Sequence, residues 1–196
     1  NKVSGQSNIN KEYQSNWVFY FSNVDDNYSS ISIDLGLINI APIQTQLYIV
    51  YVSIKMNNPR KDGLSSNDEA KILWDIEDKI NANFKNQNLD ITYVGRLTSN
   101  GFRDFYFFAS NKIIVEKIIS ESMISFSDYQ FDVGSKEDKE WKSYFEFLYP
   151  LPRQMQSIQN FKVVENIERG GDDLLKEREV FHWIYFKDSK KLDQFE

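Results

Sequence analysis

Hydrophobic and polar residues follow strand-like patterns in two short segments near the N-terminus. The segment WVFYF over 17–21 is aromatic and favours a strand, and in ISIDLGL over 31–37 every second residue is apolar. The intervening SNVDDNYSS consists of residues that favour turns. We therefore predict a hairpin, or two adjacent strands, after a loose polar lead-in over residues 1–15.

The pattern then changes to a continuous apolar run followed by helical spacing. The run LYIVYVSI over 47–54 predicts a central strand covered on both faces. Ser66 and Glu69 form a capping box, and apolar residues follow at intervals of three and four as far as Phe84. This spacing predicts a helix over 66–86.

A second hairpin is predicted around an Asn-Gly pair. The segments 91–97 and 102–108 alternate in the manner of strands and flank Asn100 and Gly101. Asn-Gly is the strongest short signal for a two-residue hairpin turn. Such a turn would pair Thr98 with Arg103.

The remaining elements complete a recognisable order. Asn111 can cap a short helix, and SFSDYQFDV over 125–133 predicts a last strand. The order from 47 to 133 is then β-α-β-β-α-β, which is the split βαβ of ferredoxin-like folds. We predict an α+β protein: a ferredoxin-like βαββαβ module with an extra N-terminal β-hairpin.

Beyond this module the pattern predicts the beginning of a second one. WKSYFEFLY over 141–149 has helical spacing and is stopped by Pro150 and Pro152. Another helix follows, and EVFHWIYF over 179–186 predicts a strand. One strand cannot bury itself, so the second ferredoxin-like module looks incomplete. The expected domains are a lead-in over 1–15, an α+β domain over 16–150, and a helical linker with a partial domain over 151–196.

Composition narrows the classes of function. The 196 residues are 41% hydrophobic and 15% aromatic, enough for a substantial core. Cysteine is absent, which excludes disulfides, thiolate metal sites and thiol catalysis. The net charge of −6 repels phosphate backbones. No apolar run approaches the roughly 20 residues that span a bilayer, so we expect a soluble cytoplasmic protein without a membrane partner.

Two sets of residues could hold a metal, and each has a simpler explanation. His182 is the single histidine and lies inside a predicted strand, so we expect a structural or interface role rather than a ligand or general base. Asp25 and Asp26 lie in a predicted turn, which aspartate favours for its own hydrogen bonds. Paired carboxylates can also hold Mg²⁺, so a metal-dependent hydrolase using them with Arg103 remains an alternative.

The absence of catalytic motifs favours a protein that binds. The sequence holds no phosphate-binding glycine loop, nucleophile elbow or zinc-protease helix. We therefore predict no catalytic residue, no metal and no cofactor, and expect that the protein is not an enzyme.

Two arginines are the most suggestive binding residues. The predicted turn pairs Arg96 with Phe105, so Arg96 and Arg103 share one face of the hairpin. Two guanidinium groups beside an aromatic ring suit an anion or a stacked base, although pairing with local carboxylates such as Asp104 or Asp90, or a solvated face, is the simpler explanation. The segments 102–108 and 47–54 also correspond to the strands on which RNA-recognition motifs carry aromatics, so RNA or nucleotide binding is the alternative function.

Several blocks of the sequence, in order, resemble a known family. They are WVFYFSNVDDNYSSISIDLGL, MNNPRKDGLSSNDEAKILWDIED, YVGRLTSNGFRDFYFF and WKSYFEFLYP. Together they run from about Trp17 to Pro150 and resemble the family catalogued as domain of unknown function 695. The resemblance supports the domain boundary and implies no activity.

The C-terminal segment resembles a second family. From about Phe161, the residues ENIERGGDDLLKEREVFHWIYFKDSKKLDQFE look like the opening of the domain named for the regulator of ribonuclease E activity B. This resemblance implies a ferredoxin-like domain that inhibits an endoribonuclease by binding it. We therefore expect a non-enzymatic regulator or adaptor with a protein partner, to be sought among RNA-processing nucleases such as a ribonuclease. The sequence does not indicate the oligomeric state.

Overall fold

A six-stranded antiparallel sheet forms the centre of the N-terminal part of the chain. In the computed structural model, the described residues are 13–87 and 89–177, with 179, 181, 184, 185 and 188. The strand order is β1-β2-β4-β5-β3-β6. The strands are β1 (Trp17–Val24), β2 (Asn27–Asp34), β3 (Tyr48–Lys55), β4 (Ile91–Ser99), β5 (Phe102–Ala109) and β6 (Phe131–Glu137).

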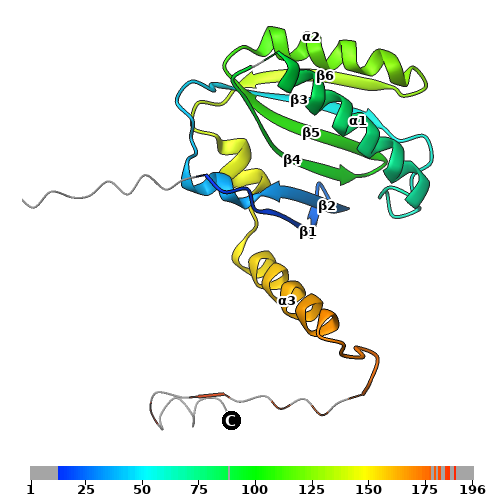
Figure 1. Ribbon diagram of the computed structural model, residues 1–196, viewed down its shortest axis with the longest axis vertical. Helices are drawn as coiled ribbons and strands as arrows, with labels where there is room; N and C mark the ends of the chain where they lie inside the picture. Colours follow the sequence, from blue (N-terminus) through cyan, green and yellow to red (C-terminus); the bar gives the residue numbers. More distant parts are fainter. Residues whose placement is uncertain are drawn as a thin grey trace, which may run out of the picture. The chain divides into compact units, whose positions relative to one another are not determined.

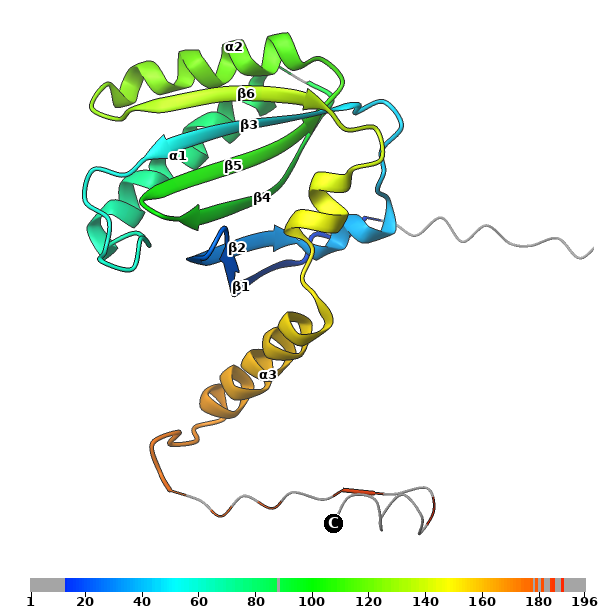
Figure 2. The ribbon, with the colours of Figure 1, turned by 180° about the vertical axis from the view of Figure 1, so that it is seen from behind.

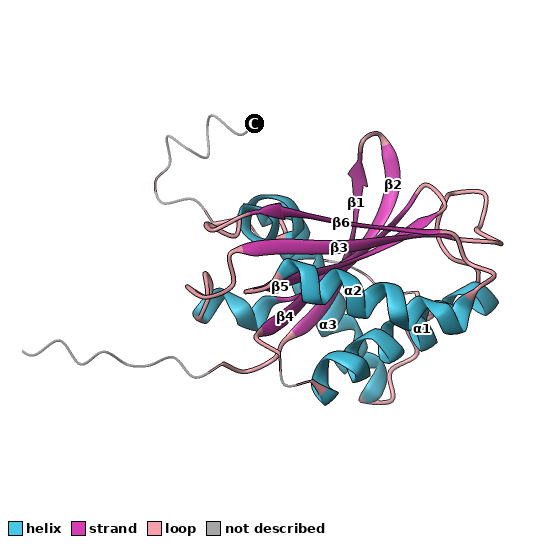
Figure 3. Cartoon of the chain, turned by 90° about the horizontal axis from the view of Figure 1, so that it is seen from above, coloured by secondary structure: helices cyan, strands magenta, loops and turns pink. Residues whose placement is uncertain are grey.

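Four of these strands and two helices form the predicted ferredoxin-like module. The helices are α1 (Asn67–Asn86) and α2 (Lys112–Met123). In chain order the elements are β3-α1-β4-β5-α2-β6, and the strands lie side by side as β4-β5-β3-β6. Both helices lie on the same face of this sheet (Figures 1 and 3). The α+β prediction and its βαββαβ module are confirmed.

Helix α1 begins where the sequence predicts, but its cap differs from a capping box. The hydroxyl of Ser66 accepts from the Glu69 N–H at 3.4 Å. The Glu69 carboxylate is buried and accepts instead from the N–H groups of Asn57 and Asn58, at 3.0 and 2.8 Å. It therefore ties the helix to the loop that follows β3. The buried apolar stripe of α1 packs on the sheet through Leu73, Ile76, Ile80 and Phe84.

The β4–β5 hairpin has the predicted register. Asn100 and Gly101 form its turn with φ values of 49° and 81°, the left-handed conformation that Asn and Gly tolerate. Thr98 pairs with Arg103 and Arg96 with Phe105. The one irregularity in this pair of strands lies between Tyr93 and Gly95, just before Arg96, and the pairing from Gly95 to the turn is regular.

The N-terminal hairpin extends the sheet rather than covering it. Strand β2 pairs with β4, and β1 pairs with β2 through a turn at Asp25 and Asp26. The predicted strand over 31–37 is corrected at its end, because β2 stops at Asp34 and Leu35–Asn39 forms a 3-10 helix. The Asp34 carboxylate accepts from the Gly36 N–H at 2.9 Å, which caps that helix.

Asp34 also orders the residues just before β1. Its Oδ2 accepts from the hydroxyls of Tyr13 and Ser15, at 2.6 and 3.1 Å, and its Oδ1 accepts from the Asn16 N–H at 2.7 Å. The end of the predicted loose lead-in is therefore fixed, and residues 1–12 lie outside the described part of the chain.

The second face of the sheet is covered by the segment after β6. Figure 2 shows this helical segment, in yellow, on the face opposite α1 and α2. Trp141, Tyr144 and Leu148 are fully buried against the sheet. At Gly95 a Cβ would lie 2.6 Å from the Ser32 carbonyl oxygen and 3.6 Å from Leu148, so the absent side chain admits the backbone of β2 rather than the covering segment. The central strands are thus covered on both faces, as their apolar run predicts.

Three predicted boundaries need correction. The last strand begins at Phe131 rather than at 125, because Ile124–Phe126 continues α2 as a 3-10 helix. The helix predicted over 141–149 is a single π-helical turn over Ser143–Leu148. Pro152 begins the next helix rather than ending the previous one, since the first helical position needs no N–H donor.

The chain divides at about residue 160 into two units. Helix α3 (Pro152–Arg169) spans this division, and Gly171 ends it with φ 88°. The strand predicted over 179–186 and the second ferredoxin-like module lie largely outside the described residues. Among those described, no helix is both long and apolar enough to cross a membrane.

Candidate functional site

A groove of about 750 Å³ separates α1 from the N-terminal hairpin on the helix-covered side of the sheet. It exists because α1 and α2 cover β3 to β6 and do not extend over β1 and β2 (Figure 1). Its walls come from α1, β1, β2 and β4, and include Trp17, Ser32, Glu77, Tyr93 and Arg96.

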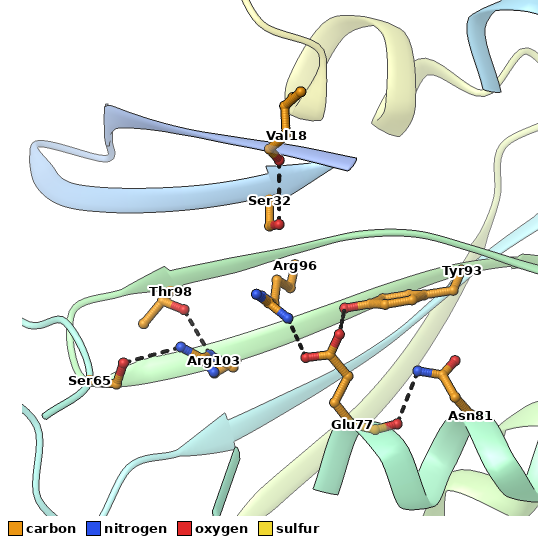
Figure 4. A network of polar contacts seen from close by, with 9 residues as sticks. All are labelled: Val18, Ser32, Ser65, Glu77, Asn81, Tyr93, Arg96, Thr98 and Arg103. Carbon is orange, nitrogen blue, oxygen red and sulfur yellow. Dashed lines mark hydrogen bonds and ion pairs between the residues drawn. The ribbon is translucent and has the colours of Figure 1, made fainter. Parts of the chain in front are cut away.

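Arg96 lies in this groove and is held by a carboxylate of α1. Its Nη1 donates to Oε2 of Glu77 at 2.5 Å, and the Tyr93 hydroxyl donates to Oε1 of the same carboxylate at 2.9 Å (Figure 4). Burial, followed by the negative charge of Glu77, raises the pKa of Tyr93 well above its ordinary value. The Tyr93 hydroxyl therefore stays protonated and donates. Glu77 thus satisfies both groups, and Arg96 is a paired cation rather than an open anion site.

Arg103 is buried nearby and bonds to hydroxyl groups. Its Nε donates to Thr98 at 2.8 Å and its Nη2 to Ser65 at 3.1 Å (Figure 4). Its Nη1 is buried and has no hydrogen-bond partner. Burial, followed by the positive charge of Arg96, lowers the pKa of Arg103 to about 10. The side chain is only 6% exposed, so a large ligand does not reach it.

Phe105 lies under α1 and is not available for stacking with a base. Its exposure is 0%, and it belongs to the core that the apolar stripe of α1 fills. The structure does bring Arg96, Arg103 and Phe105 together on one face, as the hairpin register predicts. That face is the one covered by helices, which corrects the expectation of an RNA-binding surface built on these three residues.

Exposed aromatic rings line the uncovered side of the N-terminal hairpin. Trp17, Phe19 and Phe21 of β1 are 41%, 47% and 49% exposed, and Tyr28 of β2 is 44% exposed. Phe21 stacks on Tyr28 with centroids 5.3 Å apart, and Trp17 contacts Tyr93 at 5.1 Å. We call these four residues the aromatic platform. Contiguous exposed apolar surface of this kind marks interaction sites in folded proteins.

The platform lies on an edge strand. Strand β1 pairs with β2 on one side, and no described strand pairs with its other side. An edge strand presents backbone N–H and C=O groups that can pair with an added strand. The opposite side of β1 is anchored, because Val18 and Tyr20 are buried and the Tyr20 hydroxyl donates to the Leu148 carbonyl at 2.8 Å. The platform is therefore presented on a fixed strand.

The two aspartates occupy the tip of the same hairpin. Asp25 and Asp26 have φ values of 49° and 62°, and the Asn27 side chain donates to the Asp25 carbonyl at 2.7 Å. These are the backbone conformations of a tight two-residue hairpin turn. No group of three or more acidic or histidine side chains in the described part of the chain could hold a metal. His182 lies outside the described residues.

The sequence gives a partial signal for the platform. Residues 17, 19 and 21 share one face of a strand and are all aromatic. Val18 and Tyr20 on the other face are also apolar, so alternation alone could not show which face is exposed. Which face of β1 is exposed depends on tertiary structure, because α1 covers the sheet only as far as β4.

Two family models match the chain. The model described as a family of unknown function, DUF695, matches residues 15–149. The model described as regulator of ribonuclease activity B matches residues 157–196. No curated protein and no solved structure matches the chain. The first match covers the sheet, the groove and the aromatic platform.

Proposed function

The chain belongs to the family of unknown function DUF695, and from this premise we propose that it is a non-enzymatic regulator that binds a protein partner through the aromatic platform. The observation that carries the proposal is the exposure of four neighbouring aromatic rings on the edge hairpin. Glu77, Arg96 and Tyr93 bond to one another, so none of them needs a small ligand as a partner. This arrangement suits a preformed binding surface.

The second family match supports a regulatory role and suggests the class of partner. Residues 157–196 match a model whose description names a regulator of ribonuclease activity. We therefore propose that the partner is a ribonuclease and that the two proteins bind in the cytoplasm. The proposal assigns no catalysis, metal or cofactor to the chain.

The geometry favours an extended segment of the partner. A strand added to the outer side of β1 would form backbone hydrogen bonds with it, as in β-augmentation. Every second side chain of that strand would lie beside Trp17, Phe19 and Phe21, which point to one face of β1. Backbone pairing would supply affinity, and contact with the rings would supply selectivity.

Aromatic residues also suit the energetics of an interface. Trp and Tyr dominate measured hot spots, where truncation to alanine costs about 2 kcal/mol or more of binding free energy. The rings here are partly packed on one another, so little conformational entropy is lost when a partner covers them. Removing two of them should therefore weaken binding strongly while the fold remains.

The test is affinity capture of partners by the full chain from lysate of its source cells, followed by mass spectrometry. The wild type is compared with a Phe19→Ser, Phe21→Ser double variant. The matched control is Ile113→Ser, which removes a 70% exposed apolar side chain on α2, away from the platform. We expect a ribonuclease to be enriched by the wild type and the control, and lost with the double variant.

Treatment of the lysate with nuclease separates protein binding from RNA binding. Enrichment that survives the treatment supports the regulator. Enrichment that disappears would instead favour RNA or nucleotide binding, for which the platform offers rings to stack on. Equal capture by the wild type and the double variant would refute the platform as the contact surface.

A further inference from the structure

A second hollow, of about 630 Å³, lies on the opposite face of the sheet from the platform. Its floor is formed by Tyr51 of β3 and Tyr106 of β5, and one wall is Phe147 from the π-helical turn. Asp104 of β5 lies at one end. This volume is within the usual range for small-molecule sites. The site shares no lining residue with the groove beside α1.

The three rings are arranged around the hollow at angles to one another. The centroids of Tyr51 and Tyr106 are 6.4 Å apart with their planes at 43°. Those of Tyr106 and Phe147 are 6.0 Å apart with their planes at 74°. Rings tilted in this way cannot all stack on one flat ligand. They can surround one compact group instead.

Gly134 of β6 makes room for the first ring. A Cβ at this position would lie 2.4 Å from the Tyr51 hydroxyl and 2.5 Å from Cζ. The tyrosine ring therefore crosses β6 directly above the glycine. This placement leaves the ring lying along the sheet, as the floor of the hollow.

Asp104 supplies the charge at the end of the hollow. Its Oδ2 accepts from the Tyr106 hydroxyl at 3.1 Å, whereas its Oδ1 is buried and has no hydrogen-bond partner. Burial raises the pKa of Asp104, while hydrogen bonds from Ser53 and Tyr106 partly oppose that shift. The site thus contains an acceptor that the protein itself leaves unsatisfied, which is a costly arrangement inside a protein.

The other charged groups of the hollow lie at its rim. Lys136, Lys142 and Glu146 are all exposed, so their charges are screened by water. Lys142 is also paired with Glu140 at 3.0 Å. Asp104 is therefore the one charged lining residue, among those the structure describes, that is sheltered from solvent.

We propose that this hollow binds the ammonium group of an organic cation, held between the rings of Tyr51, Tyr106 and Phe147 and attracted by the negative charge of Asp104. Ring faces attract cations through their quadrupoles, and quaternary ammonium groups are bound in cages of this composition. An anion is excluded from the sheltered end, because it would meet the carboxylate there.

The test measures binding of choline to the full chain by NMR titration, with dimethylbutanol as the probe that has the same shape without the charge. We expect choline to bind roughly tenfold more tightly than the uncharged probe, as cation–π attraction predicts. Asp104→Asn should reduce choline affinity roughly tenfold and leave the uncharged probe unaffected. The control Asp132→Asn removes an exposed charge of β6 and should leave both unchanged.

A second variant tests the rings without removing one. Gly134→Ala should move the Tyr51 ring and weaken choline binding, with the fold verified by the NMR spectrum. Equal affinity for choline and the uncharged probe, or no binding of choline at millimolar concentration, would overturn the proposal. So would unchanged choline affinity in Asp104→Asn.

The ammonium group could belong to a free small molecule or to a modified protein side chain. A peptide carrying trimethyl-lysine, measured against the same peptide with unmodified lysine, separates the two sources. Tighter binding of the modified peptide than of choline assigns the site to a protein side chain. Binding of choline without a gain for the peptide assigns it to a free cation. These variants leave the aromatic platform intact, so the result is independent of the proposed function.

Discussion

The indole of Trp141 stacks on the ring of Phe108, with centroids 4.0 Å apart and planes within 10°. Its Nε1 also donates to the Gln46 carbonyl at 3.0 Å, and the side chain is fully buried. This contact fixes the start of the segment that covers the second face of the sheet and supplies Phe147 to the organic-cation site.

Shortening Trp141 should therefore destabilise the protein strongly. We expect Trp141→Ala to cost about 3–5 kcal/mol of unfolding free energy, because it leaves a large cavity. Trp141→Phe should cost less, about 1–2 kcal/mol, since it keeps a ring but loses the hydrogen bond. Urea denaturation measures both. Trp74, which is 50% exposed on α1, provides the control: its alanine variant should change stability by less than about 1 kcal/mol.

Glu77 joins α1 to the sheet through two hydrogen bonds, so its removal should also be costly. In Glu77→Ala, the guanidinium of Arg96 and the hydroxyl of Tyr93 both lose their partner. Arg96 is 27% exposed, so water relieves part of the penalty. We expect a loss of about 2 kcal/mol in thermal denaturation, and about 1 kcal/mol for Glu77→Gln, which can still accept from Tyr93.

Asp75 on the same helix provides the comparison for Glu77. It is exposed, so Asp75→Ala should change stability by no more than about 0.5 kcal/mol. If Glu77→Ala proved as mild as this control, the bridge between α1 and β4 would contribute nothing to stability.

Local sequence signals account for the features that the sequence predicted well. The register of Arg96 and Arg103 follows from the Asn100-Gly101 turn, whose preferred backbone conformation fixes the pairing of both strands. The start of α1 follows from Ser66, whose hydroxyl can cap the helix without help from distant residues. Each of these depends on neighbours in the chain.

The features that the sequence missed depend on distant contacts. Aromatic residues occupy both faces of β1 and β5, so alternation could not show that Phe105 is buried under α1 while Phe19 is exposed. The role of Glu69 was also hidden, because its partners Asn57 and Asn58 are eleven to twelve residues away. The hollow around Asp104 requires the segment after β6 to fold back over the sheet, which no local pattern indicates.

Gly134 should be sensitive to a single added methyl group. In Gly134→Ala, the new Cβ would collide with the Tyr51 ring, which must rotate away from β6. We expect a loss of about 1–2 kcal/mol, typical of overpacking, measured by thermal denaturation. Ser135→Ala, one residue along and on the other face of β6, is the control and should be nearly neutral. An equal effect of both variants would mean that the ring adjusts freely.

Asp104 should reduce stability at neutral pH, because its carboxylate is sheltered from water. Its pKa in the folded protein is raised above the ordinary value of 3.8, so the folded state holds the proton more tightly than the unfolded state does. Protonation of Asp104 therefore adds to the free energy of unfolding of the wild type below pH 3.8. This contribution is lost as the pH rises through the raised pKa. Asp104→Asn does not titrate and avoids this loss.

The variant should therefore be more stable than the wild type at pH 7, by about 1 kcal/mol, and the difference should shrink as the pH falls below the raised pKa. Thermal denaturation of both proteins across the acidic range measures it, with exposed Asp75→Asn as the comparison that should follow the wild type. A variant less stable than the wild type at pH 7 would mean that hydrogen bonds from Ser53 and Tyr106 outweigh the burial of the charge. A more stable variant that no longer binds choline would indicate that Asp104 is kept for binding at the expense of stability.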